Sequence, residues 1–68
     1  MNIDMLKGKI REHGMTQNDV AEKMGLSLSR FNAKLNETAG AEFSLGEAKA
    51  LKRVLGLSPE QVDLIFLS

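Results

Sequence analysis

The sequence has no cysteine and only one histidine, and it lacks any long hydrophobic run. Without cysteine the chain can form neither a disulfide nor a thiolate metal site, and it is compatible with a reducing cytoplasm. The longest unbroken apolar run, Leu64 to Leu67, is far too short to cross a membrane, and the N-terminal stretch MNIDMLKGKI carries charges where a signal peptide is apolar. We therefore expect a soluble, cytoplasmic protein with no membrane partner.

Neither sign of charge is in excess, because nine Lys and Arg side chains balance nine Asp and Glu side chains. A net charge of zero argues against strong non-specific binding to nucleic acid, since neutralisation of phosphates by Lys and Arg supplies most of that affinity. The charges are unevenly distributed, however: residues 1–36 carry six basic and four acidic side chains. A modest positive face in the first half of the chain remains compatible with DNA binding.

Groups that support catalysis are scarce. The chain offers one imidazole, no thiol, and carboxylates that alternate with Lys and Arg along helix surfaces. No glycine-rich phosphate loop follows a strand, and no His, Asp or Glu cluster has the spacing of metal ligands. His13 is expected to be a solvated dipole partner at a helix C-terminus, with a phosphate contact or a pH switch as the alternative. We expect no enzyme, no metal and no cofactor.

The hydrophobic periodicity predicts five short helices and no strand, which make a compact all-α bundle in a single domain, residues 1–68. The first helix spans Ile3 to His13, and its inward residues lie three and four positions apart. The fourth begins at Ser44 in an S-x-x-E capping box and ends at Gly56. The fifth begins at Ser58, followed by proline at the first helical position. The predicted buried stripe of the fourth helix is Leu45, Ala48, Leu51 and Leu55.

The stretch TQNDVAEKMGLSLSRFNAKLN, which begins at Thr16, predicts two short helices that cross at a tight turn. The threonine can cap the first helix, and Gly25 lies where that helix must end in the left-handed backbone conformation. Ser27 can cap the second helix, to which Phe31 and Leu35 give an inward face. An apolar pair, a glycine, an apolar residue and a capping serine in this order describe a helix-turn-helix.

This stretch resembles the helix-turn-helix of the Cro and phage-repressor family, also called lambda repressor-like. The resemblance rests on Gln17 at the start of the first helix, Ala21 at the crossing, Gly25 in the turn and Ser27 at the start of the recognition helix. It implies a small phage-type Cro or repressor protein, a sequence-specific transcriptional regulator that binds operator DNA through the major groove. Such regulators read two half-sites as homodimers. The length leaves no room for an effector domain, so no small-molecule effector is expected.

The recognition helix provides the residues expected to read bases. With Phe31 and Leu35 inward, helical geometry places Leu28 nearer the buried side. Leu28 also lies at the N-terminal end, which points into the groove, so it can touch a thymine methyl. Relatives often have glutamine here, and leucine cannot make the two-bond adenine contact of that residue. The predicted base-reading residues are Ser27, Leu28, Ser29, Asn32 and Ala33.

Other residues are expected to bind the DNA backbone. Gln17 resembles the family glutamine that contacts a phosphate, and further contacts are predicted for Arg30, Lys34 and Asn36. For Arg30 and Lys34 ordinary surface polarity is the alternative.

The last helix is apolar on more than one side. Its surplus residues Leu64 and Leu67 are predicted to form a homodimer contact, with completion of a monomer core as the alternative. A protein-interaction module that keeps the fold without specific DNA binding is the alternative function.

Overall fold

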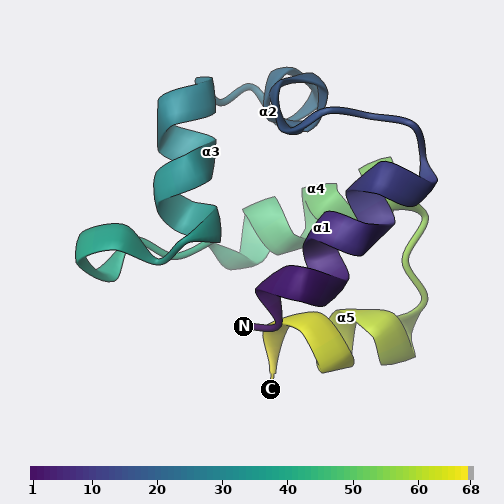
Figure 1. Cartoon of the computed structure of the whole chain (residues 1–68). Helices are drawn as coiled ribbons and strands as arrows, with labels where there is room; N and C mark the ends of the chain where they lie inside the picture. The colour runs from purple at the N-terminus through teal and green to yellow at the C-terminus, as the bar shows by residue number, and fades with distance from the viewer. Residues whose placement is uncertain (68) are drawn as a thin grey trace.

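The computed structural model describes residues 1–67, which form five α-helices, one short 3₁₀ turn and no strand (Figure 1). This confirms the predicted all-α bundle and the helix-turn-helix formed by the second and third helices. The elements are α1 (Ile3–Glu12), α2 (Gln17–Met24), α3 (Leu28–Leu35), the 3₁₀ turn η1 (Thr38–Gly40), α4 (Leu45–Leu55) and α5 (Pro59–Phe66).

Each α-helix begins at a polar side chain that accepts a hydrogen bond from an amide of the first turn. In α2 the bond is reciprocal: the Asp19 amide donates to the Thr16 hydroxyl, 3.1 Å away, and the Thr16 amide donates to the Asp19 carboxylate, 2.9 Å away. The hydrogen bond from the Thr16 amide is the main cause that lowers the pKa of Asp19, followed by the Thr16 side chain. The caps predicted at Thr16, Ser27, Ser44 and Ser58 are therefore confirmed, and Asn2 caps α1 in the same way.

A single hydrophobic core receives side chains from all five helices. Its largest fully buried member is Phe31, on α3. Leu57, which follows α4, also packs into this core, as the sequence predicts. The buried set is Leu6, Ile10, Val20, Ala21, Phe31, Leu35, Leu51, Leu55, Leu57 and Ile65.

The predicted stripe of α4 is wrong at one position. Leu51 and Leu55 are buried and Ala48 is half-buried, but Leu45 is 75% exposed. At about 100° per residue, Leu45 lies roughly 100° around the helix from the direction midway between Leu51 and Leu55, whereas Ala48 lies roughly 40° away. The first residue of α4 therefore projects away from the core.

The segment between α3 and α4 contains a feature that the sequence did not predict. Its sequence, NETAGAEF, shows no helical or alternating pattern, yet Thr38–Gly40 forms a 3₁₀ turn. Glu37 and Ala39 adopt φ values of 54° and 53°, in the left-handed region that residues with a Cβ rarely occupy. The segment closes onto the core through Phe43, whose ring centroid lies 5.6 Å from that of Phe31.

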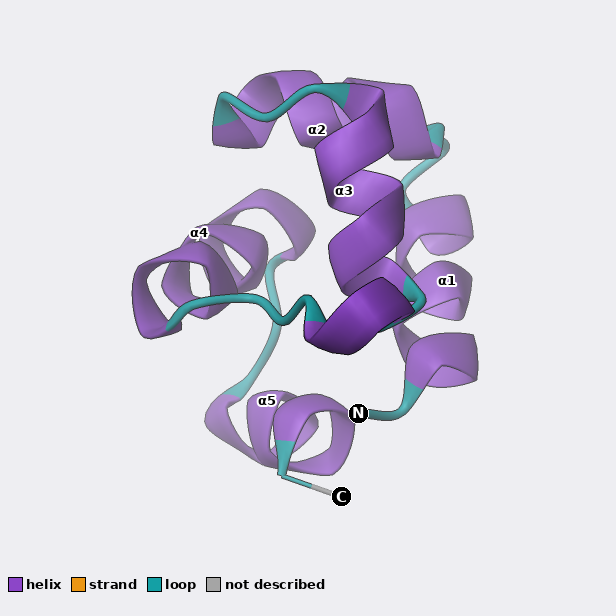
Figure 2. Cartoon of the chain, turned by 90° about the vertical axis from the view of Figure 1, so that its left-hand side faces the viewer, coloured by secondary structure: helices purple, strands orange, loops and turns teal. Residues whose placement is uncertain are grey.

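The two ends of the described chain meet on one side of the molecule. The Asn2 amide donates to the Ile65 carbonyl over 2.6 Å, so the start of α1 lies against the end of α5. Figures 1 and 2 show α2 and α3 together on the opposite side from α5. The helix-turn-helix is thus carried on a base made of the other three helices. None of the helices within residues 1–67 is long and apolar enough to span a bilayer.

Candidate nucleic-acid interface

The turn between α2 and α3 is fixed by backbone hydrogen bonds and by one left-handed glycine. Gly25 has φ of 73°, and its amide donates to the Glu22 carbonyl at 3.0 Å. The Leu26 amide donates to the Ala21 carbonyl at 2.9 Å, and the Leu26 side chain packs against the core. Because these bonds satisfy the last carbonyls of α2, the chain reverses within two residues and begins α3 at Ser27.

The crossing of α2 and α3 is closely packed. Val20 and Ala21 on α2 are fully buried, and so are Phe31 and Leu35 on α3. The family resemblance puts Ala21 at this crossing, and its side chain is fully buried. The buried face of α3 is therefore anchored, and its other side is left for contacts outside the fold.

The exposed part of α3 is its first turn. Leu28 is 41% exposed, and Ser29 and Arg30 are exposed as well. Helical geometry had placed Leu28 nearer the buried side, and the structure instead leaves it open to solvent. Asn32 and Ala33, one turn further on, are half-buried. The five predicted base-reading residues thus lie between the cap Ser27 and Ala33, which is in the second turn of α3.

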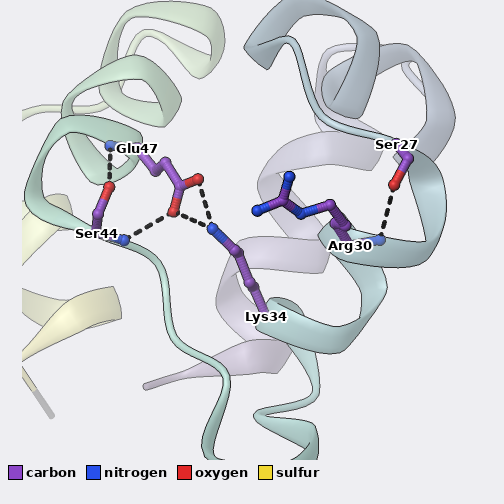
Figure 3. A network of polar contacts seen from close by, with 5 residues as sticks. All are labelled: Ser27, Arg30, Lys34, Ser44 and Glu47. Carbon is purple, nitrogen blue, oxygen red and sulfur yellow. Dashed lines mark hydrogen bonds and ion pairs between the residues drawn. The ribbon is translucent and has the colours of Figure 1, made fainter.

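Two polar side chains at the ends of α3 take part in hydrogen bonds with the backbone of that helix. The Ser27 hydroxyl oxygen accepts from the Arg30 amide at 3.2 Å (Figure 3), which leaves its proton free to donate. The Asn36 side-chain amide donates to the Asn32 carbonyl at 3.0 Å and closes the end of α3. Both residues have structural roles besides the DNA contacts predicted for them, and those contacts stay predictions.

Gln17 is the first residue of α2 and is half-buried. It borders a shallow hollow between α1 and the start of α2, to which Lys7 and Arg11 contribute basic side chains. The first turn of a helix has amides without an intrahelical partner and a positive dipole end, and both favour an anion. This location is consistent with the phosphate contact predicted for Gln17.

Lys34 differs from Arg30, although both were predicted to bind phosphates. The Lys34 ammonium Nζ donates to both carboxylate oxygens of Glu47, at 2.7 and 2.6 Å, and the two side chains are only 17% and 20% exposed (Figure 3). The Lys34 contact is the main cause that lowers the pKa of Glu47, followed by the Ser44 amide. The Arg30 side chain is exposed and has no hydrogen bond or ion pair within the part of the chain that the structure describes.

The sequence missed Glu47 as the partner of Lys34. Its only signal was the S-x-x-E box, which places a carboxylate at the start of α4 but says nothing of a lysine thirteen residues earlier. Only packing brings the end of α3 and the start of α4 together.

Leu64 and Leu67 do not complete the core of this chain, because they are 56% and 79% exposed. The alternative to a homodimer contact, completion of the monomer core, is therefore wrong. The proposed contact itself stays a prediction.

Within residues 1–67, no three His, Cys, Asp or Glu side chains lie together as a metal site would need.

A short helix with an anchored inner face and an open first turn, presented after a glycine turn, places the chain in the class of helix-turn-helix proteins. The family model described as the Cro/C1-type HTH DNA-binding domain matches residues 5–63. The chain belongs to this family, as the resemblance predicts. Searches of curated proteins and of solved structures returned no significant match.

Proposed function

We propose that this chain is a sequence-specific transcriptional regulator of the small phage Cro or repressor kind, which binds operator DNA by placing α3 in the major groove. The proposal rests on the first turn of α3, whose outer side is exposed to solvent. On the opposite side of the helix Phe31 and Leu35 are completely buried. Family membership supports it. An α-helix with its side chains is about 10 to 12 Å across, which matches the width of the major groove, so α3 can lie in the groove.

In this proposal different side chains of α3 make different kinds of contact with the DNA bases. Ser29 and Asn32 supply hydrogen bonds to base edges, and Asn32 suits the two-bond contact to adenine. Leu28 and Ala33 offer apolar contacts to thymine methyls, and Ser27 donates its free hydroxyl proton. With so few polar readers, DNA shape contributes part of the specificity.

Backbone contacts orient the helix in the groove. We assign them to Gln17 at the start of α2, to Arg30 on the exposed face of α3, and to Asn36 at its end. Such contacts position the protein and carry little direct sequence information.

The proposed assembly on DNA is a homodimer, because regulators of this fold read two half-sites about 34 Å apart. Leu64 and Leu67 are the proposed contact, since their exposure leaves apolar surface uncovered at the end of α5. The same exposure favours the second candidate function, a protein-interaction module that keeps the fold but does not bind DNA specifically.

Selection from a pool of random duplexes, followed by footprinting of the enriched sequence, tests the first function against the second. A regulator enriches one sequence, and its log K falls linearly with log salt between about 50 and 200 mM. An interaction module enriches none. Binding that is weak, uniform across sequences and insensitive to salt would refute the proposed regulator.

A further inference from the structure

One ion pair joins the end of the proposed reading helix directly to α4. Lys34 lies on the last turn of α3, and Glu47 on the first turn of α4. Both carboxylate oxygens accept from the same ammonium, at 2.6 and 2.7 Å, and both side chains are mostly buried. Bonds between charged groups with this geometry are the strong kind, particularly where solvent is largely excluded.

The Glu47 carboxylate is itself held in place. Its Oε1 accepts from the Ser44 amide at 2.8 Å, and the Glu47 amide donates to the Ser44 hydroxyl at 3.1 Å. Figure 3 shows this capping box and the lysine meeting at one carboxylate. A carboxylate fixed by its own helix start is a rigid anchor, because its side chain has already lost its rotational freedom.

Between the two helices the backbone is left-handed at Glu37, Ala39 and Gly40, and the only regular element there is the short 3₁₀ turn η1. The Lys34–Glu47 pair bridges this irregular segment. It therefore ties the C-terminal end of α3 directly to the start of α4.

We propose that Glu47 is a positioning residue for DNA recognition: it holds Lys34 inside the fold, where Lys34 steadies α3 and binds no phosphate. This inference rests on the proposed DNA-binding function. It replaces the phosphate contact first predicted for Lys34. Arg30, one turn earlier and exposed, then remains as the cation that α3 presents to the DNA backbone.

The arrangement has a consequence for specificity. A free cation on the reading helix strengthens binding to every sequence alike, because phosphates are the same everywhere. Because Lys34 is paired with Glu47, its charge is not available to DNA phosphates. The pair also fixes the orientation of α3, which favours contacts with the correct bases. The ratio of operator to random-DNA affinity is thereby raised.

The salt dependence of DNA binding tests the proposal, because its slope counts the phosphates that the protein neutralises, about 0.9 per contact. The probes are a random-sequence duplex and the duplex enriched by selection. The key variant is the double substitution Lys34→Met with Glu47→Gln, which removes both charges and keeps a side chain that can cap α4. Arg30→Met is the matched control, since it removes an unpaired cation from the same helix.

On the random duplex the double variant is expected to keep the slope of the unmodified chain, whereas Arg30→Met lowers it by about 0.9. Glu47→Gln alone releases Lys34, so random-DNA affinity and slope rise while the ratio of selected to random affinity falls severalfold. A slope that drops by about 0.9 in the double variant would identify Lys34 as a phosphate ligand and overturn the proposal. Circular dichroism before each titration confirms that each variant is folded.

Thermal unfolding separates failure of this inference from failure of the proposed function. If the unmodified chain binds no duplex, the function fails, and the link is still tested by the melting temperatures of the two single variants and the double variant. Coupled residues give single-variant losses that do not add. Strictly additive losses mean that the two side chains are not linked, and the inference fails whatever the chain binds.

Discussion

Individual side chains on α3 divide into those that hold the helix and those that remain free to bind. The Ser27 hydroxyl oxygen and the Asn36 amide are bonded to the backbone of α3, and Lys34 is bonded to Glu47. The Ser29 side chain has no hydrogen bond within residues 1–67 and is exposed. Direct readout needs unengaged donors and acceptors, so the free polar groups are the strongest candidates.

Replacing Ser29 or Asn32 by alanine is expected to cost on the order of 1 to 3 kcal/mol of binding to the selected duplex, and less to random DNA. The reason is that each truncation removes hydrogen bonds made only to the preferred bases. Titration of both duplexes by fluorescence anisotropy at fixed salt measures the two losses. Glu60→Ala, an exposed change on α5, is the control and should alter neither affinity. Equal losses on the two duplexes would show that α3 is not the reader.

Gln17→Ala is expected to weaken binding to all sequences by the same factor, with the ratio of selected to random affinity unchanged. A backbone contact carries little direct sequence information, which is why its loss acts uniformly. The same pair of titrations measures this. A loss confined to the selected duplex would instead assign Gln17 a part in base recognition.

The residues at the ends of the helices determine where each helix begins and ends. Side-chain caps start all five, and left-handed glycines terminate α2 and α4, at Gly25 and Gly56. Gly8, by contrast, lies in the middle of α1, where glycine only weakens the helix. A Cβ added at Gly8 or at Gly25 would meet no atom within 4 Å, so the two positions differ in backbone conformation and not in space.

This difference gives a matched pair of substitutions with opposite signs. Gly25→Ala is expected to destabilise the fold by about 1 kcal/mol, because alanine disfavours the left-handed backbone. Gly8→Ala is expected to stabilise it by about 0.5 to 1 kcal/mol through helix propensity. In a domain of this size each kcal/mol moves the melting temperature by about 4 to 8 °C. If thermal unfolding shows both variants shifted in the same direction, the left-handed turn at Gly25 is not what limits that position.

The whole molecule carries apolar surface that its own fold does not cover. Leu67→Asp is expected to lower operator affinity about tenfold or more, equivalent to about 1.4 kcal/mol, because a buried aspartate would oppose the proposed dimer contact. The monomer should stay folded, since Leu67 is 79% exposed. Sedimentation and DNA titration measure the two effects.

Leu45→Asp serves as the comparison for this change, because Leu45 is equally exposed but lies at the start of α4. It should leave dimerisation and DNA affinity unchanged. If Leu45→Asp separates the subunits and Leu67→Asp does not, the dimer contact lies beside α4 and the proposed interface is misplaced.

Acid is expected to weaken the fold through the Lys34–Glu47 link. The ammonium lowers the pKa of Glu47 below its ordinary value of 4.5, so near that pH the unfolded chain binds more protons than the folded one. The stability gained from the link is fully present above the ordinary value and is lost as the pH falls through the lowered pKa. Urea unfolding midpoints between about pH 6 and pH 3 measure the loss, and Glu47→Gln should flatten the curve. An unchanged pH dependence in that variant would contradict the link.

Local chemistry was sufficient to place the helices. The capping residues, the glycine in the turn and the proline at the start of α5 act on neighbouring backbone, so their effect can be read from spacing alone. The inward face of α3 follows from helical periodicity. The family resemblance is local too, because it rests on particular residues between Gln17 and Ser27.

Contacts between distant residues were decided only by the tertiary structure. The exposure of Leu28 depends on which neighbouring helices cover each side of α3, and helix periodicity gives a direction but not a neighbour. The left-handed φ at Glu37 and Ala39 could not be predicted, because neither residue type favours that backbone conformation. The partner of Lys34 depends on how α3 and α4 are placed, and a lysine on a helix surface has the same local sequence whether it faces a phosphate or a buried carboxylate.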